Sequence, residues 1–217
     1  MPREHYDQQL RLLQDDLLRL GGQVEAAVGA AIDAFSRRDV DAARRVIAED
    51  DAIDRAQYDL EDRALLLIAL QAPLAADLRL ISAVISIAGE LERVGDYAEG
   101  IAKLAVRGAA DQVIEPPPEI AQMARLAQRM LRDALDAFVQ RDVATAQRLS
   151  AADDEVDHLT TVVQNSLLER LRDPAHVEPA LRLFFVTHNL ERVADRATNI
   201  AERTIFLVTG EITELNQ

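Results

Sequence analysis

Four pairs of acidic residues, each with its two members four positions apart, are the part of this sequence best suited to chemistry. The pairs are Asp50 with Asp54, Glu92 with Asp96, Asp153 with Asp157, and Glu191 with Asp195. Residues at this spacing lie one turn apart on one helix face, where like charges repel by about 0.2 to 0.5 kcal/mol. A bound cation would offset that repulsion, since Mg²⁺, Ca²⁺, Mn²⁺, iron and zinc all accept carboxylate oxygens. A single pair is typical of a solvated acidic face, so the argument depends on all four.

The pairs fall within an internal repeat. Residues 91–102, "LERVGDYAEGIA", and 190–201, "LERVADRATNIA", are identical at 8 of 12 positions. Residues 31–54, "AIDAFSRRDVDAARRVIAEDDAID", and 134–157, "ALDAFVQRDVATAQRLSAADDEVD", are identical at 13 of 24 positions. Similarity on this scale predicts two copies of one supersecondary unit, each carrying two of the acidic pairs.

The composition predicts an all-α protein. The 217 residues are 49% hydrophobic and include only 8 glycines, 7 prolines and no cysteine, while strong helix formers fill most positions. The absence of cysteine excludes disulfides, thiolate ligands and a cysteine nucleophile. Any metal must therefore be held by oxygen or imidazole.

The charge of the chain favours cations as ligands. A net charge of −14 and a pI near 4.7 argue against nucleic-acid binding, which requires basic residues opposite the phosphates. No run of 18 apolar residues occurs, and the opening "MPREHYDQQL" is too polar for a signal peptide. We therefore expect a soluble, intracellular protein.

Apolar periodicity and proline positions predict six helices. Apolar residues recur at alternating spacings of three and four, while Pro73, Pro174 and the run "EPPP" at 115–118 interrupt the pattern. The expected helices span residues 4–36, 39–71, 74–108, 118–140, 142–172 and 176–209. They form two tandem pseudo-repeated three-helix bundles, the first in residues 1–110 and the second in residues 118–217, joined by a proline-rich linker at 111–117.

The spacing of the pairs from the hairpin turns predicts two clusters. Counted from a turn near residue 72, Asp54 and Glu92 lie at similar distances, as do Asp50 and Asp96. The four carboxylates of the second half have the same relation to a turn near residue 174. Antiparallel helices rising 1.5 Å per residue would bring each set of four to one level. Such a cluster must either bind a cation or raise the pKa of its members.

Several other residues are weaker candidates. Glu155 and His158 form one ExxH motif, whereas ferritin-like di-iron bundles require two. Asn199 and Glu202 follow Asp195 by one and two turns, and either could extend the second cluster. No Walker-type glycine loop, GxSxG motif or nucleophile with an adjacent base is present in the sequence.

Two arginines and two histidines lie near the acidic pairs. Arg93 and Arg192 each follow the glutamate of a pair, where an ordinary salt bridge is the default and binding of an anion or of another chain is the alternative. His158 and His188 have no histidine counterpart in the repeat, so a surface position is the default for each.

The paired "LERVGDYAEGIA" and "NLERVADRATNIAE" segments, each preceded by a DDxxD segment, resemble the PhoU family of phosphate-signalling proteins over nearly the whole chain. The resemblance implies a six-helix fold and multinuclear metal clusters of iron or zinc, with manganese or magnesium as alternatives. It further implies a cytoplasmic homodimer that restrains phosphate uptake and phosphate-starvation signalling. The implied partners are the ATPase subunit of the phosphate ABC transporter (PstB-like) and a PhoR-like sensor histidine kinase, with the membrane reached only through them.

Carried over by motif, the implied metal ligands are Asp50, Asp54, Glu92, Asp96, Asp153, Asp157, Glu191 and Asp195. One departure concerns Arg196, because the family often has a histidine after the aspartate of the second motif. The leading hypothesis is a metal-binding regulatory adaptor without catalytic activity. The alternatives are a di-metal carboxylate enzyme, either an oxidase or a hydrolase, and a helical scaffold whose acidic faces are merely solvated.

Overall fold

The computed structural model describes residues 3–109 and 114–215, and these ranges contain six long helices and no strand. The helices are α1 (Arg3–Arg37), α2 (Val40–Gln71), α3 (Ala75–Arg107), α4 (Pro118–Gln140), α5 (Val143–Arg170) and α6 (Val177–Thr209), with a short 3₁₀ helix, η1 (Pro174–His176), before α6. The all-α prediction is confirmed. Every expected helix boundary lies within two residues of the observed one.

Equivalent residues begin the second helix of each half. The Asp39 side chain accepts a hydrogen bond from the Ala42 N–H at the start of α2, and Asp142 does the same for Ala144 and Thr145 at the start of α5. Such caps satisfy backbone donors that have no partner inside the helix. The expected helix 142–172 ends at Arg170 instead, because Pro174 disfavours helical geometry just before it and starts the 3₁₀ turn.

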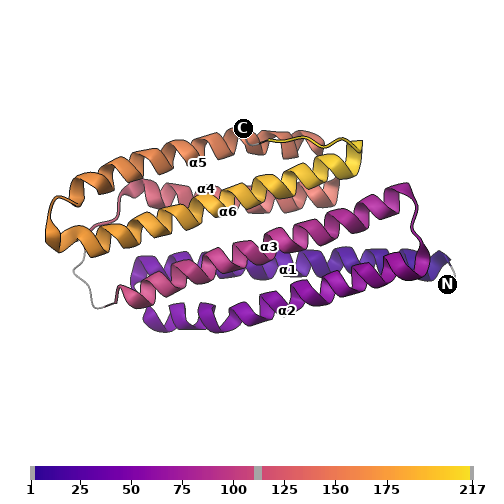
Figure 1. Cartoon of the computed structure of the whole chain (residues 1–217), viewed down its shortest axis with the longest axis horizontal. Helices are drawn as coiled ribbons and strands as arrows, with labels where there is room; N and C mark the ends of the chain where they lie inside the picture. The colour runs from indigo at the N-terminus through magenta and orange to yellow at the C-terminus, as the bar shows by residue number, and fades with distance from the viewer. Residues whose placement is uncertain (1–2, 110–113, 216–217) are drawn as a thin grey trace.

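The two halves stack with α3 and α6 in the middle (Figure 1). Helix α3 packs against α1, α2 and α6, while α6 packs against α4, α5 and α3. Small buried residues occupy the central helices, among them Ala98 and Ala102 on α3 and Ala197 and Ala201 on α6. These small buried residues allow α3 and α6 to pack closely against each other.

The connection between the halves follows α3. Residues 114–117 are not helical, and Pro118 is the first residue of α4, a position that proline tolerates well. Residues 111–113 of the expected linker lie outside the described ranges. Within the described parts of the chain, no helix is long and apolar enough to cross a membrane.

Candidate metal centre

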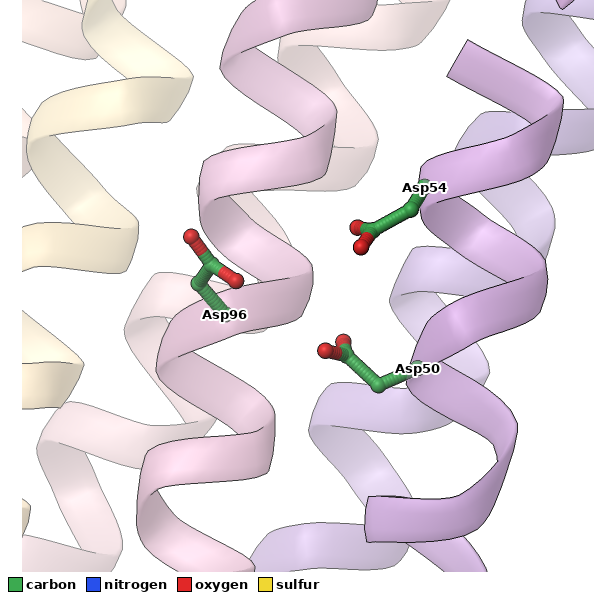
Figure 2. A group of neighbouring side chains, drawn as sticks. All are labelled: Asp50, Asp54 and Asp96. Carbon is green, nitrogen blue, oxygen red and sulfur yellow. The ribbon is translucent and has the colours of Figure 1, made fainter. Parts of the chain in front are cut away.

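The first-half carboxylates meet between α2 and α3. Asp50 and Asp54 project from successive turns of α2 toward Asp96 on α3 (Figure 2). One oxygen from each of these three side chains lies within 4.8 Å of the other two. In residues 3–109 and 114–215, no other set of three acidic, histidine or cysteine side chains is this close together. We call this set, with its neighbour Glu92, the first cluster.

Mutual repulsion in the first cluster favours a proton or a cation. Burial, followed by the charges of Glu99, Asp54 and Asp96, raises the pKa of Asp50 from 3.8 to about 6, while Lys103 opposes the rise. The pKa of Asp96 is also raised, first by burial and then by Asp54. The ionised carboxylates are thus held together at a cost that a bound cation would remove.

The remaining predicted member, Glu92, lies at the edge of the first cluster. Burial and the charges of Asp96 and Asp54 raise its pKa, so it is close enough to interact, yet it is outside the group of three. The charge of Asp54 acts on both Glu92 and Asp96, while the largest charge effect on Asp50 comes from Glu99.

Glu99 is therefore a neighbour of the first cluster that the sequence analysis missed. It lies three residues after Asp96 on α3, which places the two on one helix face, and it forms an ion pair with Lys103. The i, i+3 spacing could have revealed it. The equivalent residue of the second half is Thr198, so the repeat itself gave no signal there.

The second-half carboxylates lie between α5 and α6, and we call them the second cluster. Asp153 is only 7% exposed, and burial followed by the charges of Asp195 and Asp157 raises its pKa to about 6. The nearby Thr198 side chain, whose hydroxyl donates a hydrogen bond of 3.2 Å to the Ala194 carbonyl, opposes that rise. Asp153 thus faces Asp195 as the register argument expected.

Cationic side chains already occupy part of the second cluster. Arg192 Nη1 lies 3.0 Å from Asp195 Oδ2, and His188 Nδ1 lies 3.6 Å from Glu191 Oε2. Burial raises the pKa of both acids, whereas Arg192 and Arg196 lower that of Asp195 and His188 lowers that of Glu191. The salt bridge that was the default for Arg192 is present, and the position of His188 beside Glu191 was missed.

The two residues considered as extensions of the second cluster have other partners. Asn199 Nδ2 donates a hydrogen bond of 3.1 Å to Glu90 Oε2 on α3. Glu202 Oε1 accepts one of 2.8 Å from the Leu215 N–H. The ExxH residues Glu155 and His158 are both exposed on α5. These four candidates therefore lie away from the second cluster or are engaged elsewhere.

Polar contacts join the two halves between the clusters. Arg196 Nη1 lies 3.0 Å from Glu90 Oε2, and Arg192 Nε donates a hydrogen bond of 3.3 Å to the Tyr97 hydroxyl. The Arg192 guanidinium carbon lies 5.9 Å from the centre of the Tyr97 ring. Each arginine thus ties α6 to α3 close to a carboxylate cluster.

Residues 17–105 and 120–204 match the PhoU domain family, and the two segments carry both clusters. The chain belongs to this family. It is 36% identical over 218 residues to a protein of Clostridium acetobutylicum, and the match covers all of both chains. It is 38% identical over 208 residues to a protein of Caulobacter vibrioides strain NA1000, and that match covers 95% of this chain and 90% of the relative. Both proteins carry the name phosphate-specific transport system accessory protein PhoU homolog.

Solved structures of the PhoU family have the same fold. The phosphate transport system regulatory protein PhoU from Streptococcus pneumoniae superposes with a TM-score of 0.90 at 30% identity, covering 96% of this chain and 99% of that one. PhoU from Pseudomonas aeruginosa superposes with a TM-score of 0.91 at 30% identity, covering 95% and 100%. The two pseudo-repeated bundles are thus the fold of the family.

Proposed function

We propose that this chain is a metal-binding regulatory adaptor of phosphate homeostasis that restrains phosphate uptake and phosphate-starvation signalling. The observation that carries the proposal is the match, over nearly the whole chain, to relatives named as accessory proteins of the phosphate-specific transport system. The regulatory part is supported by the Streptococcus pneumoniae structure, which is described as a regulatory protein of that system. The six-helix fold and the four acidic pairs are the features of the chain on which such a role would depend.

The carboxylate clusters fit a hard cation. All donors are oxygens, and three of them converge within 4.8 Å in the first cluster. Burial and mutual repulsion raise the pKa values of Asp50 and Asp96. The first cluster would bind through Asp50, Asp54 and Asp96 with Glu92 at its edge, and the second through Asp153, Asp157, Glu191 and Asp195. A bound ion would neutralise the acids and join two helices of one half. Iron or zinc is proposed, with manganese or magnesium as alternatives.

The proposed partners follow from the same family membership. They are the ATPase subunit of the phosphate ABC transporter, a PhoR-like sensor histidine kinase and a second copy of the chain, all met in the cytoplasm. The strongly acidic character of the chain, with net charge −14, suits protein and cation partners rather than nucleic acid.

A catalytic role has weaker support. Relatives are named as accessory or regulatory proteins, which favours a protein that is not an enzyme. The one ExxH motif lies exposed on α5, away from the facing carboxylates that a di-metal oxidase would require. A metal-dependent turnover assay with purified protein distinguishes the two hypotheses.

Deletion of the gene tests the regulatory proposal. In an organism that has the transporter and the kinase, loss of this chain should raise phosphate-starvation gene expression while phosphate is plentiful. Reintroducing the parent protein should restore repression. Unchanged reporter expression in high phosphate after deletion would count against the proposed role.

A further inference from the structure

We propose that Arg192 competes with cations for Asp195 and so sets the cation affinity of the second cluster below that of the first. Tyr97, from the other half of the molecule, holds the arginine when a cation occupies Asp195. This inference rests on the proposed metal-binding function and adds an affinity-determining residue to it. In the first cluster, by contrast, Lys103 pairs with Glu99, which is not one of the four motif carboxylates.

The geometry places Arg192 between two partners. Its Nη1 lies 3.0 Å from Asp195 Oδ2, while its Nε donates a hydrogen bond of 3.3 Å to the Tyr97 hydroxyl. The guanidinium carbon also lies 5.9 Å from the centre of the Tyr97 ring, within the range of a cation–π contact. Arg192 can therefore give up Asp195 and keep a favourable environment on the facing helix.

Comparison of the two repeats explains why the second cluster alone has this competitor. The repeat equivalent of Arg192 is Arg93, which is exposed and, within the described part of the chain, forms no ion pair shorter than 4.0 Å. The residue equivalent to Tyr97 is Arg196. An arginine at that position offers neither a ring nor a hydroxyl to hold another guanidinium, and Arg196 itself pairs with Glu90.

Competition from Arg192 lowers the cation affinity of the second cluster, because binding of a cation breaks an existing contact. A cation that takes Asp195 Oδ2 as a ligand must displace a charge-assisted hydrogen bond, which is among the stronger polar contacts in proteins. In the first cluster, the oxygens of Asp50, Asp54 and Asp96 are already within 4.8 Å of one another. During a titration, the first cluster should therefore fill before the second.

The test measures Mn²⁺ affinity by calorimetry in proteins that retain one cluster each. Asp50→Asn with Asp54→Asn removes the first cluster, and Asp153→Asn with Asp157→Asn removes the second. In the protein that retains the second cluster, Arg192→Gln should tighten Mn²⁺ binding about tenfold, which is about 1.4 kcal/mol. Arg192→Lys keeps the charge but loses the planar guanidinium that contacts both Asp195 and Tyr97, so it should tighten Mn²⁺ binding less.

Arg93→Gln is the matched control. It removes the same charge at the equivalent position of the protein that retains the first cluster, and there the affinity should change less than threefold. Equal gains from Arg192→Gln and Arg93→Gln would overturn the inference, because they would reflect net charge alone. An unchanged Mn²⁺ affinity in Arg192→Gln would overturn it as well.

Tyrosine emission gives a readout that a general charge effect would not change. The chain has no tryptophan and three tyrosines, so replacing Tyr6 and Tyr58 by phenylalanine leaves Tyr97 as the sole emitter. Diamagnetic Zn²⁺ added to the protein that retains the second cluster should alter the Tyr97 emission, and Arg192→Gln should abolish that response. An emission response that persists in Arg192→Gln would contradict the transfer of the arginine to Tyr97.

The outcomes separate this inference from the proposed function. If the first cluster binds Mn²⁺ and the second does not bind it even in Arg192→Gln, the role of Arg192 is refuted while metal binding by the chain stands. If neither cluster binds Mn²⁺ in any variant, the metal-binding part of the proposed function fails together with the inference.

Discussion

Replacing Asp153 by asparagine should stabilise the metal-free protein at neutral pH. The carboxylate is 7% exposed and faces Asp157 and Asp195, and these surroundings raise its pKa from 3.8 to about 6. Above that pH, the folded protein holds a buried charge beside two others, whereas the unfolded chain exposes it to water. Asparagine has nearly the same shape as aspartate, but it carries no charge.

The pH dependence follows from the direction of the shift. Because the folded protein binds this proton more tightly than the unfolded chain, the resulting stability is complete below pH 3.8 and is lost as the pH rises through about 6. The rise in pKa corresponds to about 3 kcal/mol at 1.36 kcal/mol per pH unit, an upper bound that relaxation of the site reduces. We expect Asp153→Asn to gain about 1 to 2 kcal/mol over the parent at pH 7.5 and nothing at pH 4.

Urea denaturation in EDTA at several pH values measures this difference. The control is Asp154→Asn, which removes the adjacent charge from an exposed position and should change the free energy of unfolding by less than about 0.5 kcal/mol. Adding Mn²⁺ should reverse the order of parent and Asp153→Asn, because the variant has lost a ligand. A free-energy difference between parent and Asp153→Asn that is the same at pH 4 and pH 7.5 would refute the reasoning.

Two further predictions concern metal removal and helix packing. EDTA should lower the melting temperature of metal-loaded protein, since a ligand at a hundredfold excess over its Kd adds about 2.7 kcal/mol to the free energy of unfolding. Asp96→Ala should remove more of this EDTA-sensitive stability than Glu92→Ala, because Asp96 belongs to the group of three carboxylates. Equal losses in the two variants would contradict the geometry of the first cluster. Gly22→Ala should stabilise α1 by about 0.5 to 1 kcal/mol, because a Cβ there has no neighbour within 4 Å. Gly21→Ala should instead destabilise by about 1 to 3 kcal/mol, because its Cβ would lie 2.7 Å from Leu135 Cδ1. Urea midpoints check this pair, and a stabilised Gly21→Ala would show that Leu135 shifts freely.

The fold could be predicted closely because local signals agree with the tertiary packing. The apolar stripes and the proline interruptions mark the same helices, and the internal repeat doubles the information for each boundary. The caps Asp39 and Asp142 were expected inside α2 and α5 and lie one residue before them. The one boundary that moved by two residues is the end of α5. There the apolar pattern continued, while Pro174 imposed a 3₁₀ turn that periodicity alone does not reveal.

The candidate site could be predicted only in part. Counting residues from a turn gives the position of a side chain along the bundle axis, but not the direction in which that side chain points. It placed the four carboxylates of the first half at one level, whereas the structure groups Asp50, Asp54 and Asp96 and leaves Glu92 at the edge. Contacts across the halves, such as Glu90 with Arg196, depend on how α3 and α6 cross. No spacing within one segment specifies that crossing.

The two clusters show that a repeated motif need not give two equivalent sites. All eight motif carboxylates recur, yet the residues around them do not: Glu99 of the first half corresponds to Thr198, and Tyr97 corresponds to Arg196. The first cluster therefore has a further carboxylate on α3, which raises the pKa of Asp50 even though it pairs with Lys103. The second has a guanidinium on Asp195, which partly neutralises its acids without a bound cation. Differences in occupancy between the halves are thus expected to arise from positions outside the shared motif, and exchanging Glu99 and Thr198 should shift the Mn²⁺ affinities of the two clusters in opposite directions.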